Sequence, residues 1–264
     1  MHPNWQQICD EFMAATSYEL EGFDEVWAGR TGADEPKPEV YTTHPEAEHV
    51  VSLGEPEMPE GPNLWQLLKT RRSRRNFLDQ PLTFNQLNLL LWSGQGITAD
   101  MGPYQLRTAP SAGALYPIET YVAVNAVEGL EPGIYHLNVA DWSLEAIKLG
   151  CHREAVHRVL RGQSMTELAA VNLIWVANIP RCRVKYYERA YRYIFWDSAM
   201  VAENLLLAAE SLELGACVMG SWYDDLAHEL LGLDGRDHVS VLTASVGPVR
   251  GEDWREDRRP PARG

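Results

Sequence analysis

The sequence predicts an α+β fold for this chain of 264 residues. Helical and strand-like patterns follow one another without the steady alternation that a doubly wound parallel sheet requires. Hydrophobic residues make up 45% of the chain and charged residues 23%, which is the balance of an ordinary globular protein. That balance argues against a collagen, a coiled coil or a wholly disordered chain, and the sequence has no internal repeat.

The expected elements follow from periodicity and from residues that begin or end helices. Pro62 suits the first turn of a helix with Leu64, Leu67 and Leu68 on its apolar side, and Thr83 is a plausible N-cap. The run 197–214 is apolar on more than one face and is expected to be buried. We expect helices over 5–20, 62–70, 83–92, 151–162, 197–214 and 224–231. We expect strands over 119–124, 134–137, 144–149, 171–176, 215–219 and 239–246.

The distribution of charge and the positions of proline and glycine divide the chain into three parts. These are an N-terminal helix and acidic linker (1–61), a compact body (62–250) and a short tail (251–264). Residues 1–60 contain 14 acidic and 2 basic side chains, a net charge of −12 in a chain whose total is −14. This acidity argues against nucleic-acid binding. The acidic part either covers a basic surface of the body or of a partner, or is a solvated linker.

The chain has no apolar run that could span a bilayer, and its start lacks the features of a secretory signal. Its four cysteines, Cys9, Cys151, Cys182 and Cys217, lie far apart and form no CxxC pair. In a chain of this size they are expected to be reduced thiols. We therefore expect a cytoplasmic protein that is not bound to a membrane.

A basic segment follows the helix expected over 62–70. Five of the seven residues in Lys69-Thr-Arg-Arg-Ser-Arg-Arg75 are cationic. Arginine forks and a serine hydroxyl suit a phosphate dianion, and each such bond contributes about 1.5–3 kcal/mol. The alternative is a solvated basic turn or a patch resembling a nuclear-import signal.

Two further segments are candidates for a site. The loop Ala109-Pro-Ser-Ala-Gly-Ala-Leu-Tyr-Pro117 has small residues that let a backbone approach a flat ligand closely, or it is a tight structural loop. Within Lys185-Tyr-Tyr-Glu-Arg-Ala-Tyr-Arg192, Lys185 beside Tyr186 could transfer protons, although such a pair is usually only surface.

Other chemical motifs are missing from the sequence. There is no GxSxG elbow and no P-loop, and the eight histidines show no metal-ligand spacing. Gly94-Gln-Gly96-Ile-Thr-Ala99 fits GxGxxA by its letters. It follows a predicted helix rather than a strand, so we reject a dinucleotide-binding interpretation.

Together these segments resemble the nitroreductase family of FMN enzymes, and within it the SagB-type thiazole/oxazole (azoline) dehydrogenases. Arg71-Arg-Ser-Arg-Arg-Asn-Phe77 is similar to the family's RRSxRxF opening, and 110–117 resembles the branch's PSAGALYP loop. The segment 197–215 is similar to the long helix at the family's dimer interface, and 218–225 resembles the loop along the flavin ring. The resemblance covers residues 62–250, and Phe12-Met-Ala-Ala-Thr-Ser-Tyr18 weakly resembles the branch's N-terminal helix.

The resemblance implies a mostly antiparallel central sheet flanked by helices, in an intertwined homodimer with FMN between the subunits. It implies that Lys185 and Tyr186 are the catalytic pair. The residues that it implies for FMN binding are Arg71, Arg72, Ser73, Arg75, Pro110, Ser111, Ala112, Gly113, Met219, Gly220, Ser221 and Arg258, with Arg259 as the alternative to Arg258. The loop 110–117 would serve the neighbour's flavin.

The resemblance also implies an activity: two-electron oxidation of a thiazoline or oxazoline, in a peptide or carrier-bound intermediate, to the aromatic azole. A cyclase or another biosynthetic protein would be the partner. Ala199-Met200 departs from the Gly-His that the branch often has after the Asp of the long helix. Two other functions stay open: a general NAD(P)H-dependent nitro- or quinone reductase, and a flavin-free scaffold in a biosynthetic complex.

Overall fold

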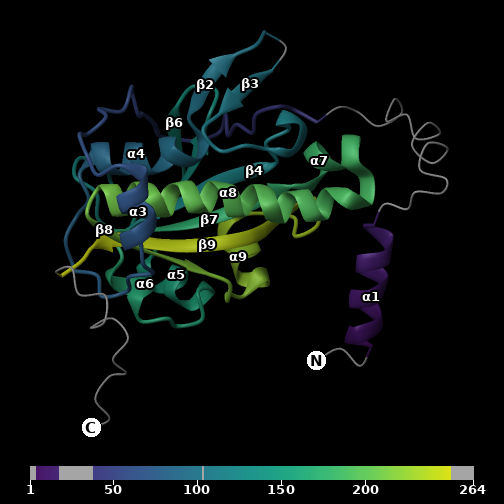
Figure 1. Ribbon diagram of the computed structural model, residues 1–264. Coiled ribbons are helices and arrows are strands. Elements are labelled where there is room, and N and C mark those ends of the chain that lie inside the picture. Colours follow the sequence, from purple (N-terminus) through teal and green to yellow (C-terminus); the bar gives the residue numbers. More distant parts are fainter. Residues whose placement is uncertain (1–3, 18–37, 103, 251–264) are drawn as a thin grey trace.

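The computed structural model describes residues 4–17, 38–102 and 104–250. Its centre is a seven-stranded sheet with the strand order β1-β6-β5-β4-β7-β9-β8, in which every neighbouring pair is antiparallel. A separate two-stranded hairpin projects from the body (Figure 1). The α+β class and the mostly antiparallel sheet that we expected are therefore confirmed.

The elements have these bounds. The strands are β1 (Val50–Ser52), β2 (Ile97–Asp100), β3 (Gln105–Arg107), β4 (Ile118–Val124), β5 (Gly133–Asn138), β6 (Ser143–Leu149), β7 (Val171–Asn178), β8 (Leu214–Met219) and β9 (His238–Pro248). The α-helices are α1 (Trp5–Ala15), α3 (Leu64–Thr70), α4 (Phe84–Gln95), α5 (Arg153–Val159), α6 (Met165–Leu168), α7 (Ile179–Tyr186), α8 (Ala190–Ser211) and α9 (Asp224–Leu231).

Helices cover both faces of the sheet (Figure 1). The long helix α8 crosses one face together with α4, and α5, α6 and α9 cover the other. Each face has its own apolar core, one reaching into α4 and α8 and the other into α5, α6 and α9. Trp175, on the inner strand β7, is completely buried. The sheet is thus sandwiched between two helical layers.

Most expected strands and helices form within a few residues of their predicted bounds. Thr83 caps α4, because its side chain accepts the backbone N–H of Gln86 at 3.1 Å. Asn63 rather than Pro62 begins α3, since its side chain accepts the N–H of Gln66 at 3.2 Å in a capping box. Gly94, two residues beyond the predicted end of the helix over 83–92, lies inside α4.

Five of the strands and α-helices just given escaped the sequence analysis: β1, β2, β3, α6 and α7. Helix α7 was not expected, although Asn178 and Pro180 are typical of a helix start. The hairpin β2–β3 was also missed. Helix α8 begins at Ala190, well before the predicted start at residue 197. The prediction missed this first part because its residues carry polar and aromatic groups. The expected helix over 5–20 ends at Ala15, and its predicted part from 18 to 20 lies outside the described residues.

Part of the predicted acidic linker packs on the body. Strand β1 pairs with β6 at the sheet edge, with Val50 opposite Glu145 and Ser52 opposite Ser143. Leu53 follows this strand and is 5% exposed. The acidic composition of residues 1–60 therefore does not prevent this stretch from joining the fold.

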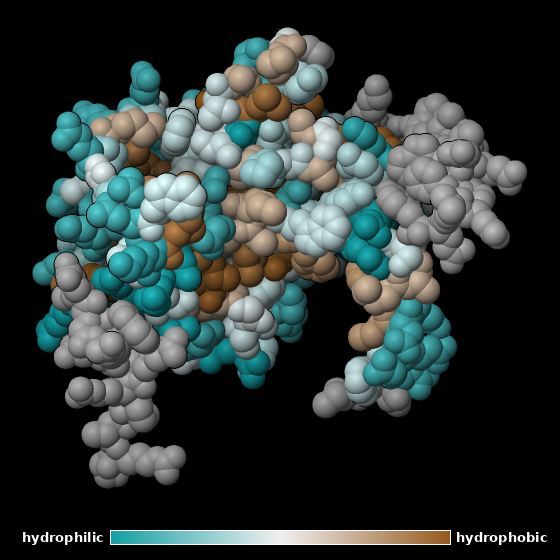
Figure 2. Space-filling model, viewed as in Figure 1, coloured by the Kyte–Doolittle hydropathy of each residue, from teal (hydrophilic) through white to brown (hydrophobic). Residues whose placement is uncertain are grey.

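Three helices, α8, α3 and α1, expose apolar side chains. Helix α8 exposes Phe195, Trp196 and Met200, and Met200 lies within the run 197–214 that was predicted to be buried. Apolar side chains gather over the front face in Figure 2. On the neighbouring helices the exposed apolar residues are Leu64, Trp65 and Leu68 of α3 and Trp5, Ile8, Phe12 and Met13 of α1. The apolar side that the sequence predicts for α3 is therefore largely uncovered in a single chain.

Candidate active site

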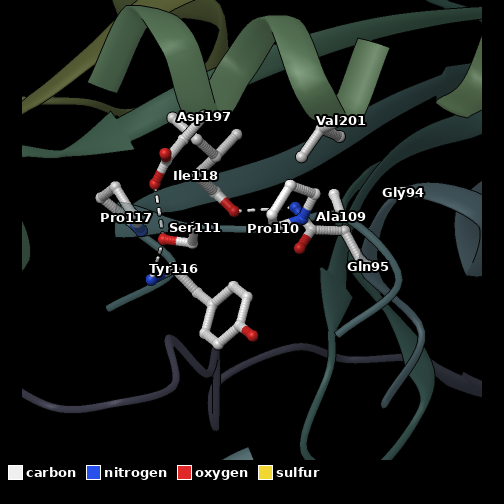
Figure 3. A pocket seen from close by; sticks show the side chains of 10 residues that line it. All are labelled: Gly94, Gln95, Ala109, Pro110, Ser111, Tyr116, Pro117, Ile118, Asp197 and Val201. Carbon is white, nitrogen blue, oxygen red and sulfur yellow. Dashed lines mark hydrogen bonds between the residues drawn. The ribbon is translucent and has the colours of Figure 1, made fainter. Parts of the chain in front are cut away.

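A tight loop over residues 110–117 is attached to α8 by one carboxylate (Figure 3). Ser111 Oγ donates to Asp197 Oδ2 at 2.5 Å, and the backbone N–H of Ala112 donates to Asp197 Oδ1 at 3.2 Å. Ser111 Oγ also accepts the backbone N–H of Tyr116 at 2.9 Å, which closes the loop on itself. Both oxygens of Asp197 are therefore used to hold this loop.

The same loop lies directly against Lys185 and Tyr186. Gly113 has a φ of +64°, and a Cβ atom at this position would lie 2.5 Å from Tyr186 Oη and 2.7 Å from Lys185 Nζ. Only glycine meets both demands, the left-handed backbone and the close approach. Two segments that the sequence singled out separately thus form one cluster.

Helix α7 places the pair at its last turn. The Asn178 side chain accepts a backbone N–H of the first turn at 3.3 Å, and Pro180 lies within that turn. The helix ends because Tyr187 has a φ of +49°. Lys185 is exposed and Tyr186 is half-buried, so both groups are accessible beside the loop.

Aromatic rings connect the pair to the N-terminal helix. The Tyr186 ring lies edge-on to that of Tyr193, with centroids 4.6 Å apart, and Tyr193 lies 5.3 Å from Trp196. The Arg189 guanidinium is 5.8 Å from the centroids of both Tyr193 and Trp196. It also donates to the backbone oxygen of Thr16 at 2.8 Å.

Arg192 makes a second attachment to α1. Its Nε donates to Thr16 Oγ1 at 2.7 Å, and one Nη donates to the backbone oxygen of Met13 at 2.8 Å. Cationic groups are favourable at the carbonyl end of a helix. The end of α1 is therefore anchored beside the Lys185–Tyr186 pair by two arginines of the same sequence block.

The basic segment 71–75 runs beside strand β8. Ser73 forms a parallel bridge with Ala216, and the N–H of Arg74 donates to the Ala216 oxygen at 3.0 Å. Burial raises the pKa of the neighbouring Cys217 thiol, and the charge of Arg75 and the hydroxyl of Ser73 oppose that rise. These side chains therefore lie close together at the edge of the sheet.

Helix α8 contacts the same basic segment through two carboxylates. Arg71 Nε lies 3.9 Å from Glu203 Oε1, and Arg74 Nη2 lies 3.7 Å from Glu210 Oε1. A groove opens between this segment and the end of α8. The basic side chains that line it are Lys69, Arg72 and Arg74. Arg72 thus borders a cavity, as a ligand-binding residue would.

The expected flavin loop continues from the far end of β8. The backbone oxygen of Met219 accepts Thr243 Oγ1 at 3.0 Å. Gly220 is exposed, with open space where a Cβ atom would lie. Arg161, which the sequence analysis did not single out, donates to Ser221 Oγ at 2.8 Å. The loop is therefore held from both sides and leaves Gly220 open for close approach by a flat ligand.

The site residues fall into two groups along α8. Asp197 holds the loop and its contact with the Lys185–Tyr186 pair, whereas Glu203 and Glu210 contact the basic segment. At 1.5 Å per residue, these carboxylates lie about 9 Å and about 20 Å along the helix from Asp197. Strand β8 connects the basic segment with residues 219–221 in the second group.

A buried ionic network, also missed by the sequence analysis, lies under the loop. Arg181 Nη1 lies 2.5 Å from Glu119 Oε1 and donates to the backbone oxygen of Tyr116 at 2.9 Å. The other Glu119 oxygen lies 3.1 Å from His136 Nε2, and His136 Nδ1 lies 3.0 Å from Glu145. Since all four charged residues are at most 5% exposed, each is compensated by a partner rather than by water.

This network also fixes part of the N-terminal segment. Arg181 donates to the backbone oxygen of Glu39 at 2.9 Å and to Thr42 Oγ1 at 3.1 Å. The backbone N–H of His44 donates to Glu145 at 3.0 Å. Because Arg181 is on α7, the helix of Lys185 and Tyr186, the segment 39–44 and the candidate pair share one support.

The network perturbs the pKa values of its members. Burial would raise the pKa of Glu119, but the hydrogen bond from His136 and the charge of Arg181 outweigh it and lower the pKa to about 2. Burial would lower the pKa of His136, but its hydrogen bonds with Glu119 and Glu145 raise it above its usual value. The network therefore favours a protonated histidine between two carboxylates.

The structure brings most of the predicted site residues into two clusters. Residues 110–113 meet Lys185 and Tyr186, and residues 71–75 meet the strand that leads to 219–221. Arg258 and Arg259 lie outside the described residues. In the sequence, Asp197 is an acidic residue between two largely apolar stretches. That signal was not recognised as marking a residue of the site.

The fold and these two groups of residues define a nitroreductase-like protein. Residues 68–247 match the model of the nitroreductase family, so the chain belongs to that family. A nitroreductase-like protein of Methanocaldococcus jannaschii is 35% identical over 171 residues, covering 64% of this chain and 83% of its own length.

Two bacteriocin-processing proteins are also similar to this chain. The trifolitoxin-processing protein TfxB of Rhizobium leguminosarum is 30% identical over 140 residues, covering 50% of this chain and 37% of that protein. The microcin B17-processing protein McbC of Escherichia coli is 26% identical over 149 residues, covering 54% of each. The matches thus span about half of these two proteins or less, and they support the SagB-type branch.

Solved structures share the fold. A chain of the E. coli microcin synthetase McbBCD complex, solved with truncated pro-MccB17 bound, has a TM-score of 0.59 at 22% identity, covering 95% of both chains. A nitroreductase-like structure from Desulfovibrio desulfuricans, in complex with FMN, has a TM-score of 0.51 at 18% identity, covering 77% of this chain and 95% of its own. In the described part of the chain, no helix has the length and apolar character needed to cross a bilayer.

Proposed function

We propose that this chain is an FMN-dependent oxidoreductase that oxidises a thiazoline or oxazoline, in a peptide or carrier-bound intermediate, to the thiazole or oxazole. The observation that carries the proposal is the contact of Gly113 with Lys185 Nζ and Tyr186 Oη. A loop suited to a flat ligand and two groups able to transfer a proton meet at one place. Similarity to two bacteriocin-processing proteins supports a peptide substrate.

The residues present fit FMN. Arg71, Arg72, Ser73 and Arg75 supply cations and a hydroxyl for its phosphate, beside a groove that Arg72 lines. A Cβ atom on Gly220 would have no atom within 4 Å, so a flat ring could approach the backbone there. Pro110, Ser111, Ala112 and Gly113 offer a second surface of small residues, and Met219 and Ser221 flank Gly220.

In the proposed reaction, the thiazoline or oxazoline ring of the substrate loses a proton and a hydride from neighbouring carbons and gains a double bond. Tyr186 Oη or Lys185 Nζ would accept the acidic proton at Cα. FMN, when bound, supplies the acceptor for the hydride, and oxygen is the final oxidant. The protein's own contribution is to hold Lys185 and Tyr186 beside the loop and to orient the azoline ring.

The exposed apolar face supports a homodimer in which the two groups of site residues come from different chains. A two-fold axis across the middle of α8 would cover Phe195, Trp196 and Met200 with their copies. It would also set the Asp197 region of one chain beside the Arg71–Glu203 region of the other. The Lys185–Tyr186 pair of one chain would then act on a flavin held by residues 71–75 of its partner.

Mixing two variants, each impaired in one of the two groups, tests this shared site when FMN is too dilute to load the Arg75→Ala site. One variant carries Lys185→Ala and Tyr186→Phe, and the other carries Arg75→Ala. If chains exchange freely, half of the dimers are mixed and each has one intact site, so the mixture should recover about a quarter of the wild-type rate. No recovery, despite exchange shown by a tagged chain, would mean that each site lies within a single chain.

Activity is tested with the purified full chain. The proposal predicts yellow protein that releases FMN, and oxidation of an azoline-containing peptide to the azole with consumption of oxygen. Lys185→Ala and Tyr186→Phe should each slow this oxidation while FMN content stays unchanged. If both variants keep the full rate, the roles given to the pair are wrong.

Reduction by NAD(P)H and flavin loading of the same purified protein distinguish two other functions. A general nitro- or quinone reductase would be reduced quickly by NAD(P)H and would be indifferent to Lys185→Ala. A scaffold would bind no flavin under any loading condition. A cyclase that makes the azoline is the partner class that the proposed reaction requires, and the exposed face of α1 is available to proteins of the same complex.

A further inference from the structure

Asp197 occupies an unusual position for a charged side chain. It lies within α8, between exposed aromatic residues and buried apolar ones, and is 5% exposed. Burial raises its pKa, and the bonds from Ser111 and Ala112 oppose that rise. A carboxylate at such a site is costly unless its hydrogen bonds are satisfied. Here both oxygens are satisfied by the same loop.

The loop needs such support because its backbone is strained. Gly113, Ala114 and Tyr116 have φ values of +64°, +54° and +47°. For the two residues with a side chain, the left-handed conformation is unfavourable. Ala114 N–H donates to the Ser111 oxygen at 3.1 Å, so the turn starts from the residue that Asp197 holds. External bonds must therefore keep the loop in this shape.

The strained loop in turn sets the place of the candidate base. Gly113 is the residue that meets Lys185 Nζ and Tyr186 Oη, and it follows directly after the two residues bonded to Asp197. We propose that Asp197 is a positioning residue for the reaction: it holds the loop against Lys185 and Tyr186 without exchanging a proton with the substrate. The inference rests on the proposed function.

Two variants test it against a matched control. Asp197→Ala removes both acceptors and should lower kcat by about 100-fold, because a misplacement of about 1 Å can cost that much. Ser111→Ala removes one bond and should lower kcat by about 10-fold, which keeps the test open if Asp197→Ala does not fold. Asp79→Asn, which changes a carboxylate that is 71% exposed, should have no effect. KM should stay unchanged in all of them, and FMN content should stay unchanged in Asp79→Asn.

The conservative variant separates positioning from direct proton transfer. In Asp197→Asn, the amide oxygen can still accept the Ala112 N–H, and the amide nitrogen can donate to Ser111 Oγ. We expect Asp197→Asn to keep kcat within a few-fold of wild type, with an unchanged pH profile. Loss of activity equal to that of Asp197→Ala, together with the loss of one limb of the pH profile, would overturn the inference.

Hydrogen exchange separates failure of this inference from failure of the proposed function. Amides of residues 112–116 should exchange faster in Asp197→Ala than in the wild type, whether or not the protein oxidises an azoline. If wild-type protein lacks the activity but shows this difference, the proposed function fails while Asp197 still orders the loop. If exchange and kcat are both unchanged in Asp197→Ala, Asp197 has no positioning role.

Discussion

A Cβ atom on Gly113 would lie 2.7 Å from Lys185 Nζ, closer than real Cβ contacts allow. Gly113→Ala should therefore push the loop away from Lys185 and Tyr186 and lower azoline oxidation by about 100-fold. Gly129→Ala is the matched control, because Gly129 also has a positive φ of +75° but no atom within 4 Å of its Cβ position. The rates of azoline oxidation and the melting temperatures of both variants test this prediction. An equal loss of activity in both would point to backbone strain alone.

The basic segment gives a prediction about FMN affinity. Arg75→Ala should weaken FMN binding about 10- to 100-fold, the effect of losing one charge-assisted bond of about 1.5–3 kcal/mol. Fluorescence titration of the stripped protein with FMN measures it. Arg236→Ala removes an arginine whose side chain is 84% exposed and should leave the affinity unchanged. Unaltered affinity in Arg75→Ala would exclude this residue from the phosphate site.

The buried network predicts how stability depends on pH. The pKa of Glu119 falls from 4.5 to about 2 on folding, so its contribution is present above pH 4.5 and is lost as the pH falls towards 2. At about 1.36 kcal/mol per pKa unit, the loss is about 3 kcal/mol. His136 acts in the opposite sense: its raised pKa gives a contribution that is complete below pH 6.5 and is lost as the pH rises through the raised value.

Glu119→Gln isolates the acidic limb of this profile. The variant should be less stable than wild type at neutral pH by about 3–5 kcal/mol, because His136 and Arg181 lose a charged partner. It should also show a flatter dependence of the unfolding free energy between pH 4.5 and pH 2. Urea unfolding at several pH values measures both. Glu128→Gln, at an exposed position, is the control, and an acidic limb as steep in Glu119→Gln as in wild type would contradict the assignment.

The attachment of α1 gives a prediction about local order. Arg192→Ala removes the donors to Met13 and Thr16. An isolated helix of 11 residues is marginal in water, so residues 5–15 should exchange their amide hydrogens faster in this variant. Arg183→Ala, which removes an exposed arginine of α7, should leave that exchange unchanged. Equal exchange in wild type and Arg192→Ala would show that another contact orders α1.

Local motifs carried most of what the sequence could predict. The basic segment, the loop 110–117 and the Lys185–Tyr186 pair each occupy one short stretch and could be recognised without a fold. Strands such as β7 were predicted because β-branched and apolar residues form continuous runs. The resemblance then placed these segments in one family, which the match over residues 68–247 confirms.

Long-range relationships could not be predicted in this way. Glu119, His136, Glu145 and Arg181 come from four separate elements, so no local pattern connects them. Asp197 was seen only as the start of a helix, because its partners Ser111 and Ala112 lie far away in the chain. Likewise, the apolar composition of α8 predicted burial but could not tell that one side of it faces outward in a single chain.

Anaerobic mixing of the flavin-loaded protein with an azoline-containing peptide is the decisive test of the proposed oxidation. We predict that the visible absorbance of oxidised flavin disappears as the azole forms in equal amount, and that Tyr186→Phe combined with Lys185→Ala slows both changes together. Flavin that stays oxidised in the wild-type protein while NAD(P)H reduces it readily would contradict the proposal.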